Sequence, residues 1–98
     1  MSRQRVVVVV QGVVQGFGFR WFVQRTASRL GVDGWVRNRA DGAVELTAEG
    51  DATAVAQLLH AVEQGPDGAM VSGVSVRQEP PTGLLGGFSI RSGSHPGD

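Results

Sequence analysis

The sequence predicts an α+β sandwich in which an antiparallel sheet carries two helices on one face. Apolar residues alternate or run together in five short segments typical of strands, and they recur at helical spacing in two longer segments. The resulting order is βαββαβ with a short extra strand at the C-terminal end. Because crossovers between parallel strands are right-handed in nearly all proteins, the four main strands are expected in the order 4-1-3-2, with the last strand at an edge.

The first half of the chain is expected to form a strand, a helix and a hairpin. The strand covers roughly residues 5–11, around five consecutive valines, and the helix covers about residues 20–30, where apolar residues recur at helical spacing. Two further strands are predicted over residues 34–38 and 43–49. Asp41-Gly42 between them is a strong hairpin signal, because both residue types tolerate the positive φ of a primed turn.

The second half is expected to add a helix and two strands. Asp51 is the predicted N-cap of the helix, and Gly65-Pro66 ends it. The apolar face of this helix is predicted at Ala52, Val55, Ala56, Leu59 and Val62. The strands follow near residues 71–78 and 87–91.

Length and composition restrict the class of protein. Ninety-eight residues make one domain, expected over residues 1–91, and the glycine-, serine- and proline-containing residues 92–98 are expected to form a disordered tail. The absence of cysteine excludes thiolate metal sites and thiol nucleophiles, and we expect neither a metal nor a cofactor. Nine basic residues balance nine acidic ones, so no nucleic acid or membrane partner is expected. No segment has the length of a bilayer span or of a signal peptide, so we expect a cytoplasmic protein. We also expect a monomer.

The segment from Gln15 to Arg20 has the layout of an anion-binding loop, because it joins a strand to the first turn of a helix. Gly16 and Gly18 allow the backbone to turn so that successive N–H groups point at one place. The start of the helix adds unpaired N–H groups and the positive end of its dipole. The Arg20 guanidinium is suited to two oxygens of a phosphate. The alternative is an ordinary glycine turn followed by a solvated arginine, and the loop alone favours neither.

The predicted topology brings Asn38 to the same edge of the sheet. The strands over residues 5–11 and 34–38 are parallel with one strand between them, so their C-terminal ends are expected roughly 10 Å apart. Alternation places Asn38 on the helix-covered face with Val36, so that it points toward the start of the first helix. The alternative is a strand-end residue that bonds its own backbone. Because Asn38 is expected beside an anion-binding loop, the functional role is favoured over the structural one for this residue.

These two segments resemble the signatures of the acylphosphatase family. The resemblance rests on VQGFGFR at residues 14–20 and on GWVRNRADGAVE at residues 34–45, at the spacing the family uses, and it extends over residues 5–91. It indicates a small stand-alone acylphosphatase with the ferredoxin-like α/β sandwich of that family. The chain departs from the family pattern at Phe17, where a small aliphatic residue is usual, and in the residues that follow Arg91. A bulky Phe17 is expected to narrow the mouth of the site.

The resemblance implies a hydrolase acting on acid anhydrides, which splits the carboxyl-phosphate bond of an acyl phosphate into a carboxylate and inorganic phosphate. Arg20 matches the catalytic arginine that binds the phosphoryl group, and Asn38 matches the catalytic asparagine that positions the attacking water. Inorganic phosphate is then both product and inhibitor. The phosphate-binding residues implied by the match are Gln15, Gly16, Phe17, Gly18, Phe19 and Arg20.

The chemistry of an acyl phosphate explains why one arginine, one asparagine and the loop are enough for its hydrolysis. Its leaving group is a carboxylate whose conjugate acid has a pKa of roughly 4, so no general acid is needed. Two other readings remain: a non-catalytic phosphate- or anion-binding module of the same fold, and an accessory domain of a larger maturation enzyme. RNA binding is disfavoured because the central strands are rich in valine where base stacking needs aromatic residues.

Overall fold

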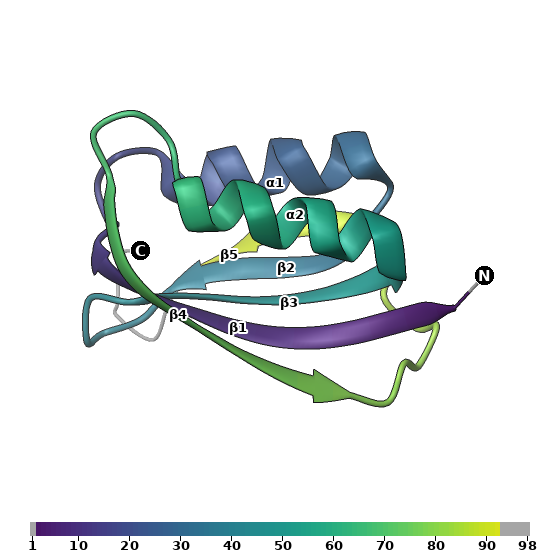
Figure 1. Ribbon diagram of the computed structural model, residues 1–98. Coiled ribbons are helices and arrows are strands. Elements are labelled where there is room, and N and C mark those ends of the chain that lie inside the picture. Colours follow the sequence, from purple (N-terminus) through teal and green to yellow (C-terminus); the bar gives the residue numbers. More distant parts are fainter. Residues whose placement is uncertain (1, 93–98) are drawn as a thin grey trace.

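Two helices lie side by side on one face of a five-stranded sheet in the computed structural model, which describes residues 2–92 (Figure 1). The predicted α+β sandwich is therefore confirmed, whereas residues 93–98 of the expected disordered tail lie outside the described part of the chain. The strands are β1 (Arg3–Val13), β2 (Asp33–Asn38), β3 (Val44–Asp51), β4 (Met70–Glu79) and β5 (Phe88–Arg91), and the helices are α1 (Phe19–Leu30) and α2 (Ala52–Gln64).

The strand order is β4-β1-β3-β2-β5, which confirms the predicted order of the four main strands and the edge position of the last. The predicted antiparallel pairing holds for the four main strands, whereas the extra strand β5 pairs with β2 in parallel. The reason is topological. β4 ends where β1 and β2 begin, and residues 80–87 cross that end of the sheet to the opposite edge (Figure 1). A chain that arrives there and forms a strand must run in the direction of β2.

Alternate side chains of the valine run form the floor of the core. Val6, Val8 and Val10 are buried beneath the helices, whereas Val7 and Val9 are half-buried on the open face. The buried face of α1 consists of Phe19, Val23, Thr26 and Ala27.

The second helix differs from the sequence prediction in two details. Its buried residues are Val55, Leu58 and Val62, so Leu58 takes the place expected for Ala56, which is exposed. Asp51 occupies the N-cap position, but its side chain makes no capping hydrogen bond. The first helical N–H group, that of Ala52, donates instead to the carbonyl oxygen of Ser2 at 2.9 Å. The start of α2 is therefore fixed by the chain preceding β1.

The hairpin between β2 and β3 also has a different turn from the one predicted. Gly42 has a positive φ of 94°, but Asp41 does not, so the two-residue primed turn is wrong. The Arg39 N–H donates to Ala43 O at 2.8 Å, and the Gly42 N–H donates to Arg39 O at 3.2 Å. This pattern fits a three-residue connection that ends on a left-handed glycine. The Asp41 carboxylate accepts from the Ala43 N–H at 3.1 Å and tightens it.

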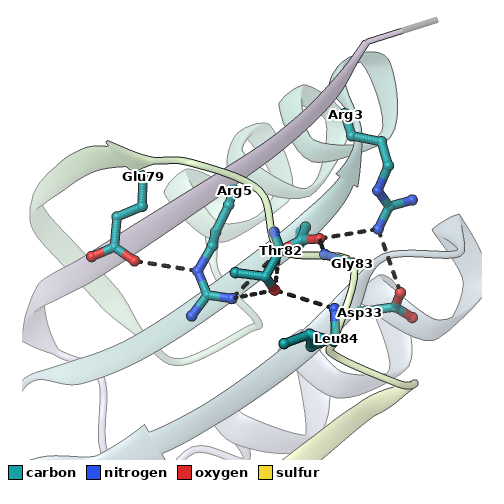
Figure 2. Close-up of polar contacts among 8 residues, drawn as sticks. Arg3, Arg5, Asp33, Glu79, Thr82, Gly83 and Leu84 are labelled. Atoms are coloured by element: carbon teal, nitrogen blue, oxygen red, sulfur yellow. Dashed lines mark hydrogen bonds and ion pairs between the residues drawn. The ribbon is translucent and has the colours of Figure 1, made fainter.

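A fully buried carboxylate, that of Glu49 on β3, holds the crossing segment 80–87. It accepts hydrogen bonds from the backbone N–H groups of Gly83 at 2.6 Å and Thr82 at 3.1 Å. Arg3 and Arg5 each approach it to 3.4 Å from β1, and Figure 2 shows Arg5 between Glu79 and Thr82. The Thr82 N–H, followed by the other donors, outweighs the effect of burial and lowers the pKa of Glu49 to about 2.

The far end of the same segment is bonded to the start of β2. The Gly87 N–H donates to Asp33 Oδ1 at 3.0 Å, and the Gly34 N–H donates to Gly87 O at 2.8 Å. Arg3 lies 3.7 Å from Asp33 (Figure 2). Because Arg3 also approaches Glu49, it connects this end of the segment to the buried carboxylate. The segment therefore fixes the register in which β5 pairs with β2 at the edge of the sheet.

The lowered pKa of Glu49 predicts how stability depends on pH. A carboxyl whose folded pKa lies below its unfolded value stabilises the fold above the unfolded pKa, and that stability is lost as the pH falls through the folded pKa. The free energy of unfolding should therefore fall between pH of about 4.5 and about 2. Glu49→Gln should cost about 3 kcal/mol at pH 7, because two arginines lose their buried partner, and should flatten this acid slope.

Urea unfolding at pH 7, 4.5 and 2 measures both effects. Glu63→Gln on α2 is the matched control, because it removes an exposed carboxylate and should leave stability and slope nearly unchanged. Parallel acid slopes for the unmodified protein and Glu49→Gln would contradict the assignment.

Candidate active site

The loop between β1 and α1 turns through two glycines in the left-handed conformation. Gly16 has a φ of 89° and Gly18 a φ of 71°. A Cβ added at either position would meet nothing within 4 Å, so backbone conformation rather than crowding requires glycine. Gly18 is the N-cap residue, and α1 begins at Phe19.

Backbone donors gather at this helix start. Within residues 2–92, none of the N–H groups of residues 15–21 donates to a protein acceptor, and the first helical bond runs from the Phe22 N–H to Gly18 O at 2.9 Å. The N-cap makes no side-chain hydrogen bond, and the first turn of this helix has no acidic residue. The positive end of the helix dipole is therefore uncompensated by these described residues, as an anion site requires.

A pocket of about 250 Å³ lies between this loop and the end of β2. Figure 1 shows both segments at the end of the sheet opposite the crossing segment 80–87. Among the described lining residues, Arg20 is the one charged side chain. The pocket is lined by Val14, Gly16, Gly18, Phe19, Arg20, Trp21 and Asn38.

The structure thus brings together most of the residues singled out in the sequence, although their roles stay predictions. The predicted residues that line the pocket are Gly16, Gly18, Phe19, Arg20 and Asn38. Within residues 2–92, Gln15 and Phe17 are not part of its lining.

Asn38 is the last residue of β2, and it is only 8% exposed. It is buried on the same face as Val36, as alternation predicts. Within residues 2–92, its side-chain amide makes no hydrogen bond to another protein group, and none of its atoms is left buried without access to solvent. This finding disfavours the alternative that the amide bonds its own strand end. The amide remains available to a ligand or a water molecule.

Arg20 is oriented by the last strand. Its Nη1 atom donates to the backbone carbonyl oxygen of Arg91 at 3.4 Å, a contact that sequence reasoning did not find. The Arg91 guanidinium itself lies 4.7 Å from the ring centre of Trp35 on the open face. The main chain of β5 therefore supports Arg20, whereas the Arg91 guanidinium packs on Trp35.

Gln15 connects the glycine loop to the hairpin that carries Asn38. Its Nε2 atom donates to Arg39 O at 2.8 Å and to Ala43 O at 3.0 Å. Sequence reasoning gave Gln15 only a backbone role and missed this contact. The available signal was the predicted topology, which placed the glycine loop and the hairpin at one edge of the sheet. We call this pair of hydrogen bonds the Gln15 brace.

Phe17 departs from the family pattern without filling the pocket. Its side chain is 41% exposed, and its ring lies against Gly68, where an added Cβ would come within 3.2 Å of the Cδ1 atom. The expectation that Phe17 narrows the mouth of the site finds no support among the described lining residues. Its bulk is directed toward the loop that follows α2.

The carboxylate of the hairpin turn is paired away from the pocket. The Ala43 N–H and the nearby Arg39 guanidinium, whose Nη2 atom lies 2.8 Å from Asp41, lower the pKa of the Asp41 carboxyl.

No group of three or more histidine, aspartate or glutamate side chains in residues 2–92 is arranged to hold a metal ion. In the same part of the chain, no helix combines the length and apolar character that crossing a membrane requires.

Comparison with known proteins decides the family. The family model for acylphosphatase matches residues 6–90, nearly the whole described domain. The chain belongs to the acylphosphatase family. An acylphosphatase of Thermococcus kodakarensis is 49% identical over 88% of this chain and 94% of its own length. One of Rubrobacter xylanophilus is 49% identical over 90% of this chain and 80% of its own length.

A solved structure agrees with this assignment. The crystal structure of an acylphosphatase from Bacillus subtilis superposes with a TM-score of 0.87 at 39% identity, covering 90% of this chain and 98% of that one. The family match and these relatives support acylphosphatase activity, and with it the hydrolase function expected from the sequence. The non-catalytic alternative is correspondingly disfavoured.

The Gln15 brace makes a prediction about the site. Gln15→Ala removes both hydrogen bonds between the loop and the hairpin, so the loop and Asn38 are no longer held in one geometry. Small displacements of reacting groups are costly, and kcat for benzoyl phosphate should fall roughly 10-fold or more. Steady-state kinetics measures the loss. Gln57→Ala, at an exposed glutamine of α2, should leave kcat unchanged, and equal behaviour of the two variants would refute a positioning role for Gln15.

Proposed function

We propose that this acylphosphatase acts by direct attack of a water molecule that Asn38 positions, while Arg20 and the glycine loop hold the phosphoryl group. One observation carries the proposal. The Arg20 guanidinium and the uncommitted Asn38 amide belong to the same small pocket, beside backbone N–H groups that have no acceptor in residues 2–92. Such a pocket is smaller than the usual site of a drug-sized ligand, and it suits a phosphoryl group with a water molecule.

Arg20 and the loop act by neutralising charge. Phosphoryl transfer depends mainly on positioning and on stabilising the negative charge of the equatorial oxygens. The planar guanidinium binds two of these oxygens, and the N–H groups of residues 15–19 bind in the concave loop. Because the loop donors have no acceptor in the described chain, they need not break protein hydrogen bonds when substrate binds.

Asn38 acts on the nucleophile. Its amide oxygen accepts a hydrogen bond from the water and aligns the water oxygen with the phosphorus. The new P–O bond forms as the bond between phosphorus and the acyl oxygen breaks, and the acyl group departs as a carboxylate with the bonding electron pair. A phosphoryl oxygen of the substrate takes the proton of the water. The step therefore needs no side chain of the protein as a general base.

The leaving group explains the composition of the site. A carboxylate departs readily because its conjugate acid is strong, with a pKa of roughly 4. A protein carboxylate near the phosphoryl group would repel the substrate, and the described lining residues include no acidic side chain. We further propose residues 1–91 as the catalytic unit. A monomeric state, a cytoplasmic location and the absence of a nucleic acid partner stay predictions.

Arg20 provides the first test of this mechanism. The purified protein should hydrolyse benzoyl phosphate, with or without a chelator, and Arg20→Ala should abolish measurable turnover. Arg20→Lys should recover little, because an ammonium group lacks the two-pronged geometry of guanidinium. Competitive inhibition by inorganic phosphate should weaken strongly in Arg20→Ala.

Arg25→Ala, at an exposed arginine of the same helix, controls for a general loss of positive charge and should keep full activity. Unchanged phosphate inhibition in Arg20→Ala would place the anion site elsewhere. Phosphate binding without any hydrolysis would favour the non-catalytic module.

Asn38 provides the second test, which separates binding from catalysis. Asn38→Ala should lower kcat by roughly 100-fold or more, the usual scale for one well-placed polar group in a transition state. The inhibition constant of phosphate should change much less, because Arg20 and the loop remain. Asn38→Asp nearly keeps the shape but places a negative charge beside an anionic substrate, so it should also be inactive. A near-normal kcat in folded Asn38→Ala would reduce this residue to a structural role.

A further inference from the structure

Trp21 is the one lining residue of the described pocket that presents a large exposed apolar surface. Its side chain is 63% exposed, whereas the apolar side chains of Val14 and Phe19 in the same lining are buried. It also lies outside the buried face of α1, which is formed by Phe19 and three residues further along. The indole therefore contributes little to the core, and an exposed apolar surface at a pocket wall indicates contact with a ligand.

We propose that Trp21 is a specificity-determining residue, whose indole contacts the acyl group and favours flat aromatic acyl phosphates over acetyl phosphate. The inference rests on the proposed function and adds the substrate class to it. In-line displacement places the leaving carboxylate opposite the water, so the acyl group points away from Asn38. The rest of the described pocket wall comes from the loop and the first turn of α1, where Trp21 alone offers apolar contact area.

The charges around the pocket favour an apolar acyl group over an anionic one. Among the described lining residues, Arg20 is the one cation, and the proposed mechanism uses it for the phosphoryl oxygens. Arg91 supplies the carbonyl oxygen that accepts from Arg20, but its own guanidinium lies over Trp35. A second anionic group on the acyl side would thus find no unused cation in the described lining, while an aromatic ring would find the indole.

Two substrates that differ only in the acyl group test the proposal. Trp21→Ala should lower kcat/KM for benzoyl phosphate roughly 10-fold, mainly through a higher KM, as expected for the loss of an aromatic contact. For acetyl phosphate the change should stay below about twofold, because its methyl group is too small to stack on the indole. The inhibition constant of inorganic phosphate should be unchanged. Trp21→Phe should recover most of the preference for the benzoyl group.

Leu84→Ala is the matched control, since it removes an 86% exposed apolar side chain in the crossing segment and should affect neither substrate. Equal losses for both substrates in Trp21→Ala, or no loss for either, would overturn the inference and leave the proposed function intact. Failure of the unmodified protein to hydrolyse either substrate would instead overturn the proposed function, and the inference with it.

Discussion

The buried carboxylate of Glu49 is the constraint on which the rest of the arrangement depends. A charge without access to water must be paired, and its partners are two arginines of β1 and two N–H groups of the crossing segment 80–87. That segment leads into β5, and the end of β5 supplies the carbonyl oxygen that supports Arg20. An ion pair at one end of the sheet is therefore connected through a single strand to Arg20, the proposed phosphate-binding arginine, at the other.

The availability of the Asn38 amide depends on how the adjoining turn is satisfied. Strand ends expose polar backbone groups, and a nearby asparagine commonly binds them. Here the Asp41 carboxylate binds the Ala43 N–H group, and Gln15 donates to the carbonyl oxygens of Arg39 and Ala43. These backbone groups of the turn consequently need no hydrogen bond from the Asn38 side chain. The same contacts that stabilise the hairpin leave one polar side chain uncommitted, and they fix its distance from the glycine loop.

The positions of Arg20 and Asn38 were predictable because they follow from local signals and topology. Glycines that follow a strand indicate the loop, and strand order with alternation places Asn38 at its edge. Glu49 was not predictable, since alternation puts it on the open face and only the distant segment 80–87 buries it. The parallel pairing of β5 and the Gln15 brace likewise depend on contacts between segments far apart in sequence. Sequence patterns report such tertiary contacts poorly.

The two left-handed glycines are the positions of the loop where a substitution should disturb the backbone most. Most donors of the loop are backbone groups, which only a substitution by proline deletes, so any other change at Phe17 alters the surface more than the donor set. Gly16 and Gly18 differ, because any other residue would resist the required φ even though open space surrounds the position of the Cβ atom. The backbone geometry of the proposed anion site is thus set by two residues without side chains. Other substitutions in the loop, proline excepted, should leave this backbone shape and the proposed donor set in place.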